Sequence, residues 1–305
     1  MIRGPDSLLP WPREAATPAA QSSRSFSDPG SNLILDFHGD PLSAGLCVFS
    51  DGNHHMALEA AVQAFVADNP GVGDVFYTTT PPAPLVDALL GEGLVIGNLT
   101  LSRKPQVFIG PAPILDKLIE AGVMTGHAPF AQSRGNVLLV RKGNPKAIGA
   151  IGDLLSAPVT LALSNPNSEK ASYVVYRDTL LGLARDTGID TNALSALISG
   201  ESGSTVFSTT IHHREVPQLL AAGQADVAVI YYHLALRYTR IFPDTFDIVP
   251  LGGVPDGERS PENLTTRYHL GLIGDGGTWG ERFVSFMRSP RVQVLYEDHG
   301  LQRVP

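Results

Sequence analysis

The chain has 305 residues, of which 43% are hydrophobic and 17% are charged, and its formal net charge is −8. This balance is typical of a globular protein, and the length exceeds that of one small domain. The negative charge argues against nucleic acid as the main partner, since phosphate binding needs a basic face, and the single cysteine excludes an intrachain disulfide.

The N-terminal segment differs in composition from the rest of the chain. Residues 1–31 are rich in Pro, Ser and Ala and contain no apolar run of about 7–15 residues that could act as a signal peptide. We therefore predict a flexible tail over residues 1–31, with the folded part beginning near Asn32.

Apolar runs and helical spacing define the first predicted elements. Residues 46–50 predict a short buried strand, and residues 58–66 carry apolar side chains at helical spacing until Asn-Pro-Gly at 69–71 ends the helix. Two further strands are predicted at 74–77 and 107–110, and a helix at 114–121.

The second half continues the alternation of strands and helices. Strands are predicted at 136–141, 159–163, 226–231 and 269–273, a long helix up to Arg185, and a helix at 216–222. Pro217 suits the first turn of this last helix, and Thr278 with Glu281 forms a capping box that predicts another helix start. Such alternation predicts an α/β fold with two mixed or parallel sheets flanked by helices.

Four loops are candidate ligand contacts, namely residues 50–55, 78–80, 165–172 and 209–215. Each is rich in Ser, Thr, Asn or His and precedes or follows a predicted strand or helix. In α/β sheets, ligands bind beyond the carboxyl ends of the strands, where helix N-termini attract anions. Each loop taken alone is also explained by helix capping, so the hypothesis needs several of them to act together.

Six segments carry motifs that occur in the same order in a known family. They are 49–59 (beginning Phe-Ser-Asp-Gly-Asn), 104–109 (Lys-Pro-Gln-Val-Phe-Ile), 129–145, 161–166 (Leu-Ala-Leu-Ser-Asn-Pro), 223–231 and 286–300. Over residues 45 to 301 the chain thus resembles the molybdate/tungstate-type periplasmic solute-binding proteins of ABC transporters, in the type II periplasmic-binding-protein superfamily. The resemblance implies two lobes joined by a hinge, with residues 32–134 and 234–305 in lobe 1 and 135–233 in lobe 2.

The resemblance also implies a function and a site. A small oxyanion, such as molybdate, tungstate or sulfate, is expected to bind in the cleft between the lobes, which close around it. The expected ligand-binding residues are Asn53, His54, Thr79, Thr80, Ala171, Ser172, His213, Arg214 and Tyr231. A membrane permease is the expected partner, the location is periplasmic or extracytoplasmic, and the protein is expected to be a monomer.

Histidines mark a departure from the family pattern. His54 and His55 lie in the first loop and His212 and His213 in the last, where the family has smaller residues, while Lys170 and Arg214 can supply positive charge. A small organic anion is therefore an alternative ligand, and so is a metal ion bound by the two histidine pairs. No His-x-x-x-His or Cys pair accompanies them, so we predict no metal site.

An enzymatic function is not expected. The segment 200–203, Gly-Glu-Ser-Gly, falls short of a nucleophile elbow, and the sequence contains no phosphate-binding glycine loop. We predict no catalytic residues and no cofactor. A cytoplasmic ligand sensor with the same fold remains an alternative that the absence of a visible signal peptide would suit.

Overall fold

A computed structural model describes residues 36–304 of the chain except 97–98, 157, 210–211 and 256. The tail predicted for residues 1–31 lies outside these described residues. None of the described helices is long and apolar enough to cross a membrane.

The chain divides into two compact units. The central unit comprises residues 133–266, and the terminal unit comprises the described residues before 133 and after 266. The predicted boundary at 233/234 is wrong, because strand β12 (Phe246–Pro250) pairs with β8 (Asn136–Arg141) along its whole length. Residues 234–266 therefore belong with the central unit.

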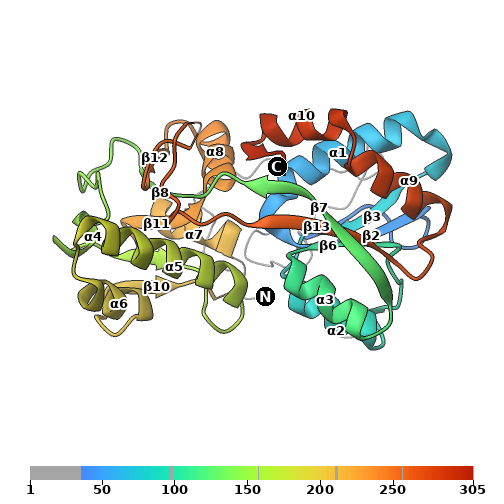
Figure 1. Ribbon diagram of the computed structural model, residues 1–305, viewed down its shortest axis with the longest axis horizontal. Helices are drawn as coiled ribbons and strands as arrows, with labels where there is room; N and C mark the ends of the chain where they lie inside the picture. Colours follow the sequence, from blue (N-terminus) through green and yellow to red (C-terminus); the bar gives the residue numbers. More distant parts are fainter. Residues whose placement is uncertain (1–35, 97–98, 157, 210–211, 256, 305) are drawn as a thin grey trace, which may run out of the picture. The chain divides into compact units, whose positions relative to one another are not determined.

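The terminal unit contains a mixed sheet with helices on both faces (Figure 1). Its strands, in spatial order, are β1 (Phe37–His38), β3 (Val75–Thr78), β2 (Leu46–Ser50), β6 (Val107–Gly110), β13 (Arg267–Ile273), β7 (Met124–Ser133) and β14 (Leu301–Gln302). Strand β2 runs parallel to β3 and β6, whereas β13 is antiparallel to β6 and β7. A separate hairpin pairs β4 (Leu94–Ile96) with β5 (Leu99–Leu101).

Strand β2 explains why this sheet is covered on both faces. Its five residues are all buried, and successive side chains point to opposite faces. Leu46 and Val48 pack in one apolar cluster with α1 (His55–Asp68), α9 (Gly277–Met287) and α10 (Pro290–Asp298). Cys47 and Phe49 pack in the opposite cluster with α2 (Pro82–Leu90) and α3 (Ala112–Glu120). Figure 1 shows the two groups of helices on opposite sides of the sheet.

The central unit contains a second mixed sheet. Its spatial order is β10 (Thr205–Phe207), β9 (Leu161–Leu163), β11 (Val227–Tyr231), β8 and β12, with β9 parallel to β10 and β11. Its helices are α4 (Asp153–Ser156), α5 (Lys170–Thr187), α6 (Thr191–Ser199), α7 (His212–Ala221) and α8 (Tyr232–Ile241). Helix α6 contacts β9 and β10, while α8 contacts β8, β11 and β12.

Two buried asparagines, Asn136 and Asn263, join the start of β8 to the segment that follows β12 in the central unit. The side chain of Asn263 donates to the carbonyls of Asn136 and Leu251 at 2.9 and 2.7 Å, and its oxygen accepts from the backbone N–H of Asn136 at 2.8 Å. The amide of Asn136 in turn donates to Thr179 on α5 at 2.9 Å. These bonds connect strand β8, helix α5 and the segment after β12 within one core.

Two predicted helix starts differ from the structure. Helix α7 begins at His212, so Pro217 lies in its interior, where it removes the N–H that would bond to the carbonyl four residues earlier. The capping box predicted at Thr278 is wrong, because α9 begins at Gly277 with Gly276 as its N-cap and no side-chain cap. Gly276 has a φ of 68°, a left-handed conformation that glycine adopts without strain, and this turn replaces the expected cap.

Candidate functional site

The first predicted loop follows β2 and forms a short 3-10 helix, η4 (Gly52–His54), ahead of α1. Asp51 caps this helix by accepting the backbone N–H of Asn53 at 3.0 Å. Burial raises the pKa of Asp51 to about 7, while the Asn53 N–H opposes the shift. This loop therefore contains a buried carboxyl group that the sequence analysis did not single out.

His54 is fully buried and uses both ring nitrogens inside the terminal unit. Nε2 lies 3.1 Å from the Ser50 hydroxyl, and Nδ1 lies 2.9 Å from the Tyr296 hydroxyl. His55, the second histidine of the pair, has its Nδ1 2.9 Å from the carbonyl of Gly52. A ligand contact by His54 would require it to give up one of these bonds, so we leave it out of the proposal below.

The second predicted loop, residues 78–80, consists of three threonines, and the two that we predicted as ligand contacts, Thr79 and Thr80, differ in their hydrogen bonding. The Thr79 hydroxyl donates to Asp36 Oδ1 at 3.1 Å and lies 3.0 Å from His38 Nε2. The Thr80 hydroxyl is buried and has no hydrogen-bond partner among the described residues. A buried polar group without a partner is costly, so Thr80 is the better candidate donor of the two.

The third loop begins at the carboxyl end of β9. Because β9 and β10 are parallel and in register at Leu163 and Phe207, Ser164 and Ser208 follow neighbouring strand ends. The Asn165 backbone N–H accordingly reaches the Ser208 hydroxyl at 3.1 Å, and the Asn165 amide donates to the Ser208 carbonyl at 3.1 Å. The Ser164 hydroxyl is buried and has no partner in the described part of the chain.

Glu169 connects this loop to the N-terminus of α7. Its carboxylate accepts the Ser208 hydroxyl at 2.7 Å and the backbone N–H of His212 at 3.0 and 3.1 Å. Burial raises the pKa of Glu169, and the Ser208 hydroxyl and the His212 N–H oppose the shift. An internal carboxylate thus accepts the His212 N–H, a donor at a helix N-terminus that we expected to be available to an anionic ligand.

The fourth loop leads into α7, and its residues 210–211 lie outside the described residues. His212, His213 and Arg214 are buried in the first turn of the helix. Burial, and then His213, lowers the pKa of His212 to about 3, so its imidazole is neutral near pH 7. Its Nε2 has no hydrogen-bond partner among the described residues. His212 is therefore a candidate ligand contact in addition to the predicted His213 and Arg214.

The remaining predicted residues have varied surroundings. Ala171 and Lys170 are exposed at the start of α5, and the Ser172 hydroxyl donates to the Glu169 carbonyl at 3.1 Å. Tyr231 is buried, and its hydroxyl lies 2.8 Å from that of Thr266. Of these four residues, Tyr231 and Ser172 contribute to the packing of the central unit.

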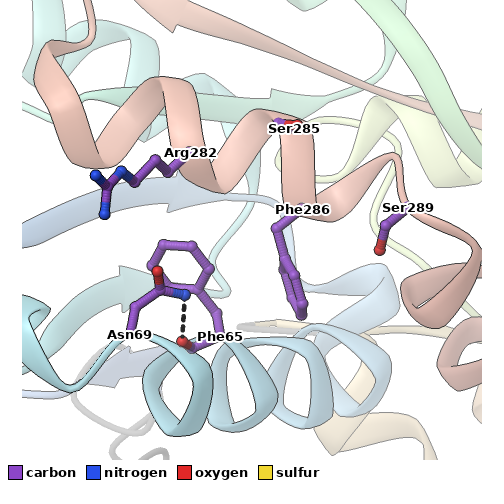
Figure 2. Close-up of a pocket in the computed structure, with 6 residues that line it drawn as sticks. All are labelled: Phe65, Asn69, Arg282, Ser285, Phe286 and Ser289. Carbon is purple, nitrogen blue, oxygen red and sulfur yellow. Dashed lines mark hydrogen bonds between the residues drawn. The ribbon is translucent and has the colours of Figure 1, made fainter.

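A surface depression in the terminal unit is distinct from these loops. It has a volume of about 470 Å³ and is lined by Phe65, Asn69, Arg282, Ser285, Phe286 and Ser289 (Figure 2). The Asn69 side chain donates to the Phe65 carbonyl beside it at 2.9 Å. Phe65 and Asn69 lie at the end of α1, whereas the loop at Asn53 precedes its start, and a helix of 14 residues is about 20 Å long.

Comparisons with known proteins identify the family and the fold of the chain. Residues 46–302 match the family model described as bacterial extracellular solute-binding protein. The chain belongs to this family. It is therefore a solute-binding protein, and its fold is that of the two-lobed periplasmic binding proteins.

Similar solved structures include three with different cargo in their descriptions. The sulfate-binding protein SubI from Mycobacterium tuberculosis is 18% identical, with a TM-score of 0.62 over 85% of this chain and 86% of that chain. The molybdate-binding protein of Azotobacter vinelandii is 14% identical, with a TM-score of 0.58 over 85% and 99%. Peb3 from Campylobacter jejuni is 14% identical, with a TM-score of 0.59 over 85% and 100%, and PEB3 is also described bound to L-phospholactate. A comparison with curated proteins found no match.

Proposed function

We propose that the chain is the binding component of an uptake system and captures a small oxyanion such as molybdate, tungstate or sulfate. The observation that carries the proposal lies in the central unit. At the carboxyl end of β9, the Ser164 hydroxyl is buried without a partner among the described residues, and so is Nε2 of His212 in the first turn of α7. An oxyanion accepts hydrogen bonds from such groups and would remove the cost of leaving them unpaired.

The character of these groups also supports an anion. His212 is neutral near pH 7 because burial lowers its pKa, and a serine hydroxyl is neutral at all relevant pH values. Neutral donors suffice for an anion in a dry site, where each hydrogen bond to the charge is strengthened. His213 and Arg214, buried in the same turn, add donors and positive charge.

Glu169 sets a condition on binding. Its carboxylate accepts the Ser208 hydroxyl and the His212 backbone N–H, so these donors already hold anionic oxygen. A second anion nearby would be repelled by Glu169 while that carboxyl group is ionised. The proposal therefore includes protonation or displacement of Glu169 when the oxyanion binds.

Thermal unfolding of the purified protein with sulfate, molybdate, tungstate and phosphate tests the proposal. A ligand at a hundred times its dissociation constant stabilises the folded state by about 2.7 kcal/mol. The Ser164→Ala variant should then lose about 1–3 kcal/mol of binding free energy, because the charged ligand loses a hydrogen bond. Ser156→Ala, which removes an exposed serine of α4, is the matched control. If none of these oxyanions raises the unfolding temperature, the oxyanion assignment is wrong.

A small organic anion is the second candidate, favoured by the bulk of His212 and His213 in the first turn of α7. Peb3 is similar in fold and is described with L-phospholactate bound. The same assay with L-phospholactate and simple carboxylates separates the two candidates. Stabilisation by these compounds alone would keep the site and change the ligand class.

The transport role implies further properties that we include in the proposal. We propose an extracytoplasmic location, a membrane permease as partner, a monomeric state and no catalysis. Fractionation of the native host and gel filtration of the purified protein test the location and the oligomeric state. A protein confined to the cytoplasm would favour the ligand-sensor alternative. Binding between the two lobes stays a prediction from the resemblance.

A further inference from the structure

Two histidines that are far apart in sequence meet on the sheet of the terminal unit. His127 lies on β7 and His269 on β13, two neighbouring antiparallel strands, and their Nδ1 atoms are 2.9 Å apart. The ring centroids are 4.9 Å apart, with the ring planes at 77°. Neither histidine belongs to the four candidate loops, and the proposed oxyanion site does not include them.

A carboxylate fixes the orientation of the first histidine. Nε2 of His127 lies 3.0 Å from Oδ1 of Asp116 on α3, the helix that contacts β13. Because Asp116 accepts the Nε2 proton, the neutral form of His127 presents a lone pair at Nδ1, toward His269. A histidine held by a carboxylate through its second ring nitrogen is the usual arrangement of a metal ligand in proteins.

We infer that His127 and His269 form a two-histidine binding site for a late first-row divalent cation of the Ni²⁺, Cu²⁺ or Zn²⁺ class. Because Nδ1 of His127 is the acceptor in this pair, Nδ1–H of His269 would be the donor. For a cation to take both Nδ1 lone pairs, the His269 proton would move through solvent to Nε2, so that both rings stay neutral and the number of bound protons does not change. Asp116 would remain bonded to His127 Nε2 and orient the ring, and water would complete the coordination shell.

The separation of the two nitrogens suits such a cation. With metal–nitrogen bonds of about 2.0–2.1 Å, two ligands at right angles are about 2.9 Å apart, and two in tetrahedral geometry about 3.3 Å apart. The observed 2.9 Å therefore requires rotation of the rings but little or no separation of the strands. His127 keeps 12% of its side-chain surface exposed, and Asp116 keeps 59%, so the cluster is open to ions from solvent.

The surrounding charges set limits on the site. Asp116 contributes a negative charge, and Arg267, two residues before His269 on β13, contributes a positive one. The Arg267 guanidinium donates through Nε to Gln132 Oε1 on the neighbouring strand β7 at 3.2 Å. Among the described residues no group of three His, Cys, Asp or Glu side chains is arranged to hold a metal, so the expected site uses two protein ligands.

Isothermal titration of the untagged full chain with Ni²⁺, and separately with Zn²⁺, tests the inference. We expect one site whose affinity falls at least tenfold in His127→Gln and in His269→Gln. Asp116→Asn should weaken binding roughly tenfold, the usual effect of losing the partner of a ligating histidine. His299→Ala removes a histidine elsewhere in the same unit and should bind as the wild type does, and Mg²⁺ should not bind at all.

Two further measurements test the inference even if a variant folds poorly. Unfolding temperatures in the presence of a chelator report whether each variant is folded before any metal is added. Paramagnetic broadening by Ni²⁺ of the wild-type NMR signals should affect the His127 and His269 rings first. Wild-type affinity in both glutamine variants, or broadening confined to other histidines, would overturn the assignment.

Discussion

The Nδ1 atom of His54 lies 2.9 Å from the hydroxyl oxygen of Tyr296, joining the first loop of the terminal unit to α10 across 242 positions of sequence. The Ser50 hydroxyl donates to the Asp51 carbonyl at 3.1 Å, so the Nε2–H of His54 can donate to Ser50 while Nδ1 accepts from Tyr296. Burial raises the pKa of Tyr296 well above its usual value, which keeps this phenol protonated. His54 is therefore fixed by the fold on both sides of its ring.

The first prediction concerns this contact. Tyr296→Phe should lower the free energy of unfolding by about 1–3 kcal/mol, because it leaves a buried ring nitrogen without a partner. Affinity for the oxyanion should stay within twofold of the wild type, since His54 is not a ligand contact in our proposal. Urea denaturation and calorimetric titration measure the two quantities. A large loss of affinity in a folded variant would return His54 to the binding site.

The sequence predicted the strands better than the helix starts. Strands β2, β6 and β8 have the predicted bounds because each is a short, continuous apolar run bordered by polar or turn-forming residues. Strand β12 was not predicted, since it reads Phe-Asp-Ile-Val-Pro and is paired along one edge only. The lobe boundary at 233 came from the resemblance, and the pairing of β12 with β8 shows that residues 234–266 belong with the central unit.

The candidate site was predictable at the level of loops but not of atoms. The sequence indicated the loops at 78–80 and 209–215 as candidates, because loops at strand ends are recognisable from apolar periodicity. The sequence could not predict the hydrogen bond between Thr79 and Asp36, or those of Glu169 with Ser208 and His212. These contacts span 39–43 positions and depend on strand register. His127 and His269 lie in contact, and no local pattern connects residues 142 positions apart.

The second prediction uses the buried hydroxyl of Thr80. Thr80→Val keeps the shape of the side chain and removes a group that has no partner in the described part of the chain, so the free protein should be equally or more stable. If the terminal unit contributes to ligand binding, the same variant should lose about 1–3 kcal/mol of binding free energy. Thermal unfolding without and with ligand measures both effects. Thr100→Val, on the hairpin strand β5, is the control.

The third prediction concerns the pH dependence of binding. The pKa of Glu169 is raised above its ordinary value of 4.5, chiefly by burial, so its negative charge appears only as the pH rises through that higher value. Oxyanion affinity of the wild type should therefore fall as the pH is raised. Glu169→Gln removes the charge and should bind roughly tenfold more tightly at pH 8, with a flatter pH profile, because a nearby like charge costs on the order of 1 kcal/mol or more.

A matched control for this prediction is Glu201→Gln, which changes an exposed carboxylate of the same unit. It should leave the pH profile of binding as in the wild type. Calorimetric titration between pH 5 and pH 8 records the profiles. An affinity of Glu169→Gln that falls with pH as steeply as that of the wild type would assign the titration to another group.

The fourth prediction concerns Asp51, whose pKa burial raises from 3.8 to about 7. Between these two values the folded state retains a proton that the unfolded chain has lost, so stability falls as the pH rises from about 4 and levels off above about 7. At about 1.4 kcal/mol per pH unit, the loss from this group amounts to at most about 4 kcal/mol.

Asp51→Asn keeps an oxygen that can accept the Asn53 N–H and removes the ionisation, so it should be more stable than the wild type at pH 8 and nearly equal at pH 4. Urea denaturation across this range, with the exposed Asp87→Asn as control, measures the slope. A variant that is less stable than the wild type at pH 8 would show that the Asp51 carboxylate stabilises the loop through contacts that asparagine cannot make.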